Sequence, residues 1–381
     1  MPGSPPSVLG DARSQVGSAT TSALHIDELL RLATRMEASD IHLRVGSLPI
    51  LRINGELVPQ TAYGALTPED IERLYMQVTD VDQRERFDET MELDLAYGLG
   101  GVGRFRINVA KQRGTITMVM RRLSLDIPSL EALGLPDVCK ELVMKPRGLV
   151  LVTGPTGSGK STTLASMLDY LNEREARRVI TIEDPIEYLF RDKHCFITQR
   201  ELGGDTLSFA SALTHTLRQD PDVILVGEMR DLETISAAIT AAETGHLVLS
   251  TLHTAGAAYT VDRIIDVFPP HQQQQIRVQV ANILQGVFSQ TLLPTIDGRG
   301  RVPAIEVMIA SPAVRNLIRE GKTHQLSGVM ETSQQLGMQT LDQALLEVYQ
   351  RGVVALDEIM AKAVNPEHLR SLVSGYAYER H

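Results

Sequence analysis

Hydrophobic residues near the start of the chain repeat with two different periods. One group follows the i, i+3, i+4, i+7 spacing of an amphipathic helix: Ile26, Leu29, Leu30, Ala33 and Met36. Other segments suit strands, most of them by alternating apolar and polar residues: 41–45, 49–54, 93–99, 104–109 and 115–120. Thr67, followed by Pro68, can cap a further helix, and Asn54-Gly55 favours a hairpin turn. The first region is therefore expected to be mixed α/β with a largely antiparallel sheet.

The pattern changes after Arg122. Residues 123–147 hold three prolines and a glycine around short helical pieces, which predicts a linker. From Gly148 onward, apolar runs typical of buried strands alternate with helices, at 148–153, 178–182, 222–227 and 247–251. This alternation predicts a mainly parallel sheet covered by helices. Beyond Pro269 the pattern predicts mostly helix, with segments at 272–289, 312–320, 340–351 and 355–373.

Four regions follow from these patterns. Residues 1–23 are rich in Pro, Gly, Ser, Thr and Ala without a hydrophobic period, and are expected to be a disordered tail. Residues 24–122 form the first domain, and 123–147 form the linker with a short helix. Residues 148–381 form the second domain, which ends in a helical region.

Composition excludes several classes of protein. The 381 residues are 43% hydrophobic and 22% charged, as in ordinary globular proteins. A net charge of -10 argues against a general nucleic-acid-binding surface. Cys139 and Cys195 are far apart in the chain, which disfavours a zinc site and fits a reducing compartment. No apolar run is long enough for a membrane span, so we expect a cytoplasmic protein.

A glycine-rich stretch follows the first apolar strand of the second domain. It fits the phosphate-loop pattern G-x-x-x-x-G-K-[ST] at every position: Gly154, Pro155, Thr156, Gly157, Ser158, Gly159, Lys160, Ser161 and Thr162. Its glycines let backbone N–H groups point at phosphate oxygens, and the following helix adds partial positive charge. Lys160 can reach the β/γ-phosphates, and Ser161 can place its hydroxyl on Mg²⁺. The chain is predicted to bind ATP with Mg²⁺.

Acidic residues follow two further strands. Glu228 comes just after the apolar run 222–227, which is the Walker B arrangement and suits a residue that activates water. Glu183, Asp184 and Glu187 follow strand 178–182 and are expected at the same sheet edge, where they can hold magnesium-bound waters. Ser161, Glu187 and Glu228 are the predicted Mg²⁺ contacts, partly through water. A solvated acidic turn is the alternative for the second group.

Histidines and arginines supply further candidates. His246 and His253 flank strand 247–251, where a histidine can sense the γ-phosphate or simply complete the core. Arginines on the strands of the first domain are candidate arginine fingers or ordinary surface charges: Arg104, Arg106, Arg113 and Arg121. The period of two places Arg104 and Arg106 on one face, opposite Phe105. Spacing does not decide whether they would serve their own site or a neighbour's.

These motifs together resemble those of the type II/IV secretion ATPases. The resemblance covers about residues 24–373 and rests on the phosphate loop, the acidic box 181–187, the Walker B segment 226–231 and the histidine box 245–253. It implies a PAS-like N-terminal domain and a RecA-like P-loop ATPase domain, with Glu228 as the catalytic glutamate. It also implies finger roles for the four arginines. Glu183 and Glu187 stay unseparated, although Glu187 resembles the residue usually given the metal-water role.

Within that family the chain is most similar to the motors that retract type IV pili in twitching motility. Residues 313–320 read AVRNLIRE and depart from the retraction signature AIRNLIRE only at Val314. On a helix, Arg315 and Arg319 would share a polar face, displayed for a partner. The two cysteines cannot form the four-cysteine metal site usual in assembly ATPases.

The resemblance implies a homohexamer that hydrolyses ATP and acts on the inner-membrane pilus platform protein. It would lie peripherally at the inner membrane through such partners, and a PilU-like ATPase is a further candidate partner. The alternatives are an accessory retraction ATPase of the PilU kind and an assembly or type II secretion ATPase. A nucleic-acid translocase is disfavoured by the acidic balance and the 4% aromatic content. A nucleotide-gated docking protein without turnover is disfavoured by Glu228 and the acidic box.

Overall fold

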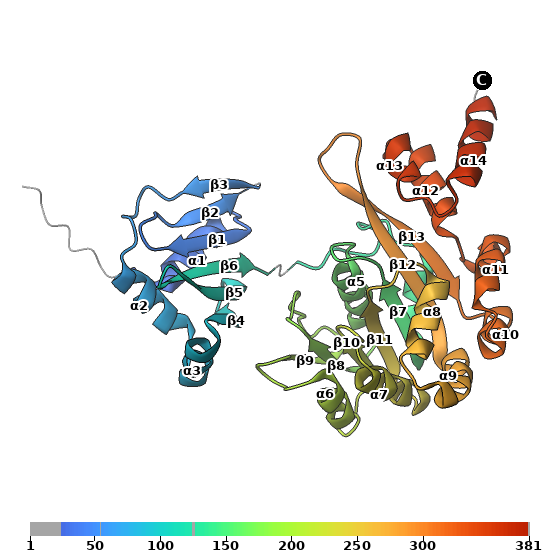
Figure 1. The fold of residues 1–381 in the computed structure, drawn as a ribbon, viewed down its shortest axis with the longest axis horizontal. Helices are drawn as coiled ribbons and strands as arrows, with labels where there is room; N and C mark the ends of the chain where they lie inside the picture. The colour runs from blue at the N-terminus through green and yellow to red at the C-terminus, as the bar shows by residue number, and fades with distance from the viewer. Residues whose placement is uncertain (1–23, 54, 124–125, 380–381) are drawn as a thin grey trace, which may run out of the picture. The chain divides into compact units, whose positions relative to one another are not determined.

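The computed structural model describes residues 24–53, 55–123 and 126–379, and the chain divides after Arg122 into two compact units (Figure 1). The expected tail over residues 1–23 lies outside the described residues, and so does Asn54 of the expected hairpin turn. Each unit is built around its own sheet and its own apolar core.

The first unit is a six-stranded sheet in the order β3-β2-β1-β6-β5-β4, and every neighbouring pair is antiparallel, as predicted. Its elements are α1 (Ile26–Arg35), β1 (Asp40–Arg44), β2 (Ile50–Ile53), β3 (Glu56–Pro59), α2 (Pro68–Val78), α3 (Val81–Thr90), β4 (Glu92–Leu99), β5 (Gly103–Gln112) and β6 (Thr115–Arg122). Thr67 caps α2 by accepting a hydrogen bond from the Asp70 backbone N–H at 3.2 Å, which confirms the predicted start of that helix. In β5, Phe105 is buried while Arg106 is exposed, so the expected alternation holds.

The second unit is a seven-stranded sheet in the order β13-β12-β7-β11-β10-β8-β9. Its first elements are α4 (Val138–Val143), β7 (Gly148–Thr153), α5 (Lys160–Asn172), β8 (Arg178–Glu183), β9 (Phe196–Glu201), α6 (Phe209–Thr216), β10 (Val223–Val226), α7 (Leu232–Glu243), β11 (Leu247–Leu252) and α8 (Ala257–Asp266). Strands β7 to β11 pair in parallel, as the βα alternation predicted.

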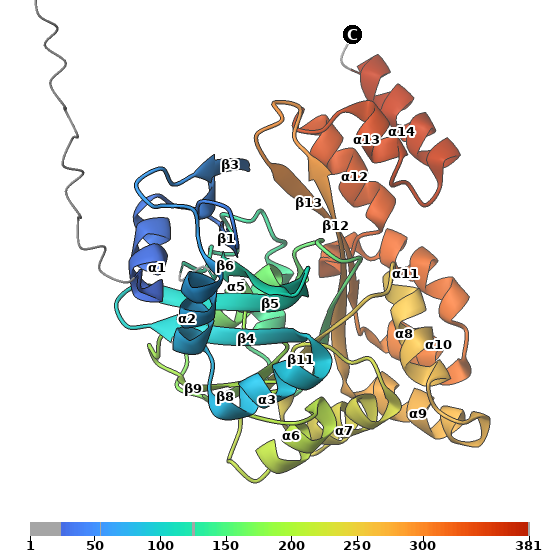
Figure 2. The same ribbon diagram turned by 60° about the vertical axis from the view of Figure 1, so that its left-hand side comes forward.

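Helices cover both faces of this sheet, as the views from two sides show (Figures 1 and 2). Strand β7 is buried along its whole length, and its alternate residues belong to two different apolar clusters. Leu149 and Leu151 pack in one cluster with α7, α8 and α9, while Val150 and Val152 pack in the other with α4 and α5. A strand buried on both faces is apolar at most positions, which explains the nearly continuous apolar run in the sequence.

The described region beyond Pro269 is mostly helical, as predicted, but the predicted helix over 272–289 is wrong in its last part. Helix α9 (Pro270–Ile283) ends where the predicted helix 272–289 was to continue, and a long hairpin follows, formed by β12 (Leu284–Pro294) and β13 (Arg301–Ile309). Strand β12 lies between β7 and β13 and is mostly buried on both faces, so its sequence does not alternate. A buried apolar run of this kind is hard to distinguish from a helix by its period.

The C-terminal part is helical but more divided than expected. It comprises α10 (Pro312–Glu320), α11 (Leu326–Thr332), α12 (Leu341–Gln350), α13 (Leu356–Met360) and α14 (Pro366–Glu379). The predicted single helix 355–373 is two, because the chain turns before Pro366 and Asp342 accepts hydrogen bonds from the N–H groups of Val364 and Asn365, both at 2.8 Å. Among the described residues, no helix is both long and apolar enough to cross a bilayer.

Helix α10 matches its predicted bounds, but its arginines are not both displayed. Arg315 turns back onto the end of α9, where it donates hydrogen bonds to the carbonyl oxygens of Ala281 and Asn282, and also to that of Ala310 at 2.9 Å. Carbonyls at a helix C-terminus lack partners within the helix, so a guanidinium satisfies them well. Arg315 therefore fixes α10 against α9. Of the two arginines expected to be available to a partner, Arg319 is the one left.

Candidate active site

The carboxyl ends of the parallel strands meet at one edge of the second sheet. The register places Thr153 of β7 opposite Leu252 of β11, and Val226 of β10 opposite Ile182 of β8. The phosphate-loop sequence leaves β7 at this edge and enters α5. Open α/β sheets bind ligands at such an edge because the loops that leave adjacent strands converge there.

The phosphate loop is shaped by glycine. Gly154 has φ 141° and Gly159 has φ 88°, both in the region that disfavours other residues. A Cβ at Gly154 would lie 2.2 Å from the carbonyl oxygen of Gln290, so no larger residue fits without moving the backbone. The loop is thus held tightly against β12.

Lys160 is folded into this loop. Its Nζ donates hydrogen bonds to the carbonyl oxygens of Gly154 at 2.9 Å and Pro155 at 3.1 Å, and the residue is buried. Burial lowers the pKa of Lys160, and the nearby carboxylates of Glu228 and Glu187 act in the opposite direction. The ammonium now donates to two neutral carbonyls. It can exchange these carbonyls for charged phosphate oxygens, which bind it more strongly.

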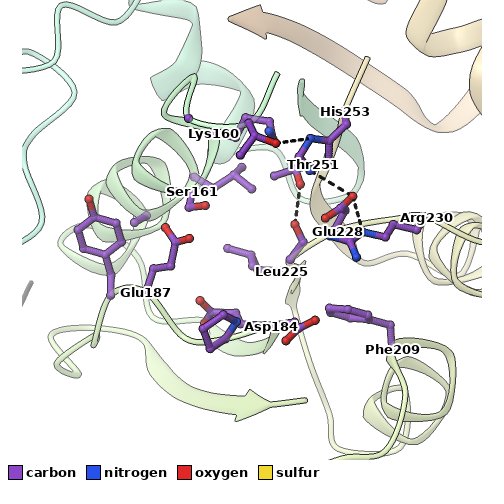
Figure 3. A pocket seen from close by; sticks show the side chains of 18 of the residues that line it. Lys160, Ser161, Asp184, Glu187, Phe209, Leu225, Glu228, Arg230, Thr251 and His253 are labelled. Atoms are coloured by element: carbon purple, nitrogen blue, oxygen red, sulfur yellow. Dashed lines mark hydrogen bonds and ion pairs between the residues drawn. The ribbon is translucent and has the colours of Figure 1, made fainter. Parts of the chain in front are cut away.

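A cavity of about 290 Å³ opens beside the loop (Figure 3). It collects side chains from all the predicted motifs, namely Thr156, Lys160, Ser161, Glu183, Asp184, Glu187, Glu228 and His253. These residues are spread over about 100 positions of sequence, and the strand order brings them to one place. The predicted phosphate-loop, acidic, Walker B and histidine segments therefore share one site.

Glu228 is the centre of a polar chain across this cavity. It accepts from the Arg230 guanidinium at 2.7 Å and lies 3.3 Å from His253 Nε2, while His253 Nδ1 lies 3.4 Å from the Thr156 hydroxyl. Burial raises the pKa of Glu228, but Arg230 and His253 outweigh it, and the net pKa lies below the usual range. An ionised carboxylate is thus connected through His253 to the phosphate loop, as Figure 3 shows.

The structure separates Glu183 from Glu187. The Glu183 carboxylate accepts hydrogen bonds from the Thr181 hydroxyl at 2.6 Å and the Gln199 amide at 3.1 Å, and burial raises its pKa. Glu187 is exposed and lies on the cavity wall with Lys160 and Ser161. Of the two, Glu187 has the more accessible carboxylate for a metal-bound water.

The predicted residue His246 does not line the cavity. His246 precedes β11, at the opposite end of the strand from His253, about 20 Å away at 3.3 Å per residue. Its Nδ1 lies 2.9 Å from the Ala241 carbonyl, so it serves the turn after α7. The four arginines belong to the first unit: Arg104 and Arg106 on β5, Arg113 in the following turn and Arg121 on β6.

Sequence reasoning missed Arg230, which lines the cavity and pairs with Glu228, and it also missed Gln290. Gln290 of β12 is buried, and its side-chain amide donates to the Ser158 carbonyl and accepts from the Thr163 hydroxyl. The signal was a polar run, Ser289-Gln290-Thr291, inside an otherwise apolar segment. No strand was predicted at Gln290, because the expected helix took in the first part of β12 and ended at residue 289.

The donor set fits a magnesium nucleotide better than a metal held by protein alone. Over the described ranges, no three His, Cys, Asp or Glu side chains cluster closely enough to bind a metal ion. The Ser161 hydroxyl and the carboxylates of Glu187 and Glu228 do line the cavity. Mg²⁺ is usually held in this way, by one or two protein oxygens together with phosphate oxygens and waters.

Known proteins resemble this chain along most of its length. The family model described as "Type II/IV secretion system protein" matches residues 17–361. This chain belongs to that family. The predicted family resemblance is therefore confirmed, and so is the α/β architecture with an N-terminal domain and a RecA-like ATPase domain.

Three relatives locate the chain within the family. It is 47% identical to the type IV pilus retraction ATPase PilT of Pseudomonas aeruginosa, over 91% of this chain and 100% of that protein. It is 41% identical to the type IV pilus ATPase PilU of the same organism, over 92% and 94%. A crystal structure of the pilus retraction motor PilT with bound ADP superposes with a TM-score of 0.86 at 48% identity, covering 91% of this chain and 99% of that one.

Proposed function

We propose that this protein is an ATP-hydrolysing motor that powers retraction of type IV pili. The observation that carries the proposal is the cavity in which the phosphate loop, Glu228 and His253 meet. The similarity to PilT over nearly the whole of both chains supports the same role. In the proposed reaction, water attacks the γ-phosphorus of ATP and releases ADP and phosphate.

Each residue at the cavity has a proposed part in this reaction. The loop N–H groups and Lys160 bind the phosphates, while Ser161, Glu187 and Glu228 hold Mg²⁺, partly through water. The ion supplies charge that neutralises the phosphate oxygens. Glu228 orients the attacking water and accepts its proton, since an ionised carboxylate can act as a base. His253 lies between Glu228 and the loop, so its contacts would change when phosphate leaves.

A homohexamer with sites completed by a neighbouring subunit is part of the proposal. The cavity contains Arg230, which is already paired with Glu228 at 2.7 Å. The arginines of the first unit, Arg104, Arg106, Arg113 and Arg121, are candidates to neutralise transition-state charge on a neighbour's ATP. Mixing Lys160→Ala subunits with subunits that lack one of these arginines should then restore part of the activity. Constant activity per subunit on dilution to monomer would contradict a shared site.

We place the motor at the inner face of the membrane, held there by the pilus platform protein. Motion of one unit against the other about the junction after Arg122 would turn hydrolysis into force on that partner. The predicted linker at 123–147 is for the most part packed into the second unit, through Leu130, Leu135 and α4. Deleting the gene should leave piliated cells whose pili do not retract. Cells without pili would indicate an assembly motor instead.

A PilU-like accessory ATPase is the second candidate, because the chain is also 41% identical to PilU. Complementation separates the two. Expressed in a strain that lacks only its PilT, this protein should restore retraction by itself. Rescue that requires the PilT protein to be present would favour the accessory role and a PilU-like partner.

A further inference from the structure

Gln290 is buried at the point where β12 passes the phosphate loop. Its amide nitrogen donates a hydrogen bond to the Ser158 carbonyl at 2.7 Å, and its amide oxygen accepts one from the Thr163 hydroxyl at 2.8 Å. One side chain thus joins the last part of the loop to the first turn of α5. The two contacts use both ends of the amide, which also fixes its orientation.

The backbone of the same residue touches the beginning of the loop. A Cβ at Gly154 would meet the Gln290 carbonyl oxygen at 2.2 Å, and one at Gly159 would meet its amide nitrogen at 2.8 Å. Gln290 therefore contacts the loop at its first glycine, at its last glycine and at the helix that follows. These points surround the backbone N–H groups that would face the phosphates.

A rigid strand supports this contact. Strand β12 pairs in parallel with β7, with Ser289 opposite Thr153, so Gln290 projects just beyond the strand that leads into the loop. On its other side, Gln290 pairs with Ile305 of β13. The amide is thus held on a strand that is paired on both sides, and it can position the loop beside it.

We propose that Gln290 is a positioning residue that holds the phosphate loop in its nucleotide-binding shape. It would not touch the nucleotide itself, and its effect would pass through the carbonyl of Ser158 and the hydroxyl of Thr163. The inference rests on the proposed function, because it concerns binding of the same nucleotide. A loop that needs no such support would bind ATP equally well without the amide.

The test compares two Gln→Leu variants on one strand. Gln290→Leu keeps the size of the side chain and removes both hydrogen bonds. Gln285→Leu is the matched control, because Gln285 also lies on β12 and donates to a backbone carbonyl, that of Arg147, at the strand's other end. Thr163→Val removes a single partner with little change in shape.

We expect Gln290→Leu to weaken ATP and ADP binding about tenfold, as the loss of hydrogen bonds at a buried carbonyl predicts. KM should rise by a similar factor while kcat changes less than threefold, since the loss affects ground and transition states alike. Gln285→Leu should keep its nucleotide affinity. Thr163→Val should weaken nucleotide binding less. A variant that combines Gln290→Leu with Thr163→Val should bind nucleotide no more weakly than Gln290→Leu alone.

Nucleotide affinity decides between positioning and plain stabilisation, and thermal unfolding without nucleotide reports any loss of stability separately. Unchanged nucleotide affinity in Gln290→Leu, whether or not its melting temperature falls, would overturn the inference. If Gln290→Leu does not fold, Thr163→Val decides by the same comparison with wild type. Wild-type protein that binds no ATP would instead overturn the proposed function.

Discussion

The two sheets of this protein use charged residues in different ways. In the antiparallel sheet, charges face one another across strands: Asp40 of β1 pairs with Arg121 of β6 at 2.9 Å and with Arg52 of β2 at 3.8 Å. In the parallel sheet, the charges of the cavity stand at the carboxyl ends of the strands, as with Glu183 and Glu228. The same residue types are therefore placed along a face in one unit and at an edge in the other.

The difference follows from how the strands run. Antiparallel pairing places side chains of neighbouring strands opposite each other, so a charge finds its partner within the sheet. Parallel strands bring all their carboxyl ends to one edge, where carboxylates and a lysine collect beside a cavity. Charges on the face should mainly affect stability, whereas charges at the edge should mainly affect nucleotide chemistry.

Glu228→Gln should give the largest effect of an edge charge. The amide cannot accept a proton, so turnover should fall by about 10²- to 10⁴-fold while ATP still binds. Steady-state phosphate release and a nucleotide-binding titration measure the two quantities. Glu243→Gln on α7 is the control, because Glu243 contacts Gln279 outside the cavity. Normal turnover in Glu228→Gln would remove this residue from the reaction.

Lys160→Ala should act on binding instead. Removing the ammonium should weaken ATP affinity by about 100-fold, the loss of roughly 2.7 kcal/mol of charge-assisted contacts. Among the described residues, Lys160 donates to two loop carbonyls, so without nucleotide its removal should change thermal stability less than it changes ATP affinity. Lys193→Ala, which removes an ammonium paired with Asp169 and Glu173 on the surface, is the control. Equal ATP affinity in both variants would contradict the prediction.

The sequence predicted the residues at the carboxyl edge of the parallel sheet better than it predicted the strands beside them. The phosphate loop, the acidic box, Glu228 and His253 were recognisable because each follows an apolar strand, and parallel strands meet at their carboxyl ends. Strands β12 and β13 were missed because β12 is buried on both faces and has no alternation. Gln290 was missed with them, since its contacts with Ser158 and Thr163 join residues more than 120 positions apart.

The positions of several other side chains were also predicted incompletely from the sequence. Sequence could not separate Glu183 from Glu187, because only the fold shows that Thr181 and Gln199 occupy the Glu183 carboxylate. It kept His246 as a candidate, although this residue precedes β11 and therefore lies at the amino end of the strand, away from the cavity. The sequence also predicted that Arg315 is exposed to a partner, but its guanidinium donates to a carbonyl at the end of α9. The contacts of Glu183 and Arg315 depend on side-chain direction, which periodicity does not give.

Asp40→Asn should show the smaller effect of a face charge. Asp40 is buried beside the more exposed Arg121 and Arg52, so loss of its charge-assisted hydrogen bond should destabilise the first unit by about 2 kcal/mol. ATP affinity should not change. Differential scanning calorimetry and a nucleotide titration measure these two results, and a loss of affinity without a loss of stability would contradict the comparison.

The same variant has a predicted pH dependence. Burial would raise the pKa of Asp40, but the hydrogen bond from Ser39 and the Arg121 guanidinium outweigh it and hold the pKa below its ordinary value. A lowered pKa contributes stability above the unfolded value of about 3.9, and this stability is lost as the pH falls through the folded pKa. Wild type should therefore exceed Asp40→Asn in stability at neutral pH, and the difference should shrink in acid. A constant difference down to low pH would indicate lost packing instead.

Arg106→Ala should change stability least of all, and it tests whether the comparison is complete. Arg106 and Asp94 are both about half exposed, with side-chain accessibilities of 47% and 58%, and their closest atoms are 3.7 Å apart. Exposed pairs of this kind contribute about 0–1 kcal/mol, so the unfolding transition should hardly move. As a candidate finger for a neighbour's ATP, however, Arg106 would lower turnover when removed, and only at concentrations where subunits assemble. Unchanged turnover at every concentration would leave Arg106 an ordinary face charge and restrict the shared-site proposal to Arg104, Arg113 and Arg121. Lower turnover with unchanged stability would show that a charge on the sheet face also serves the chemistry of an edge, in another copy of the chain.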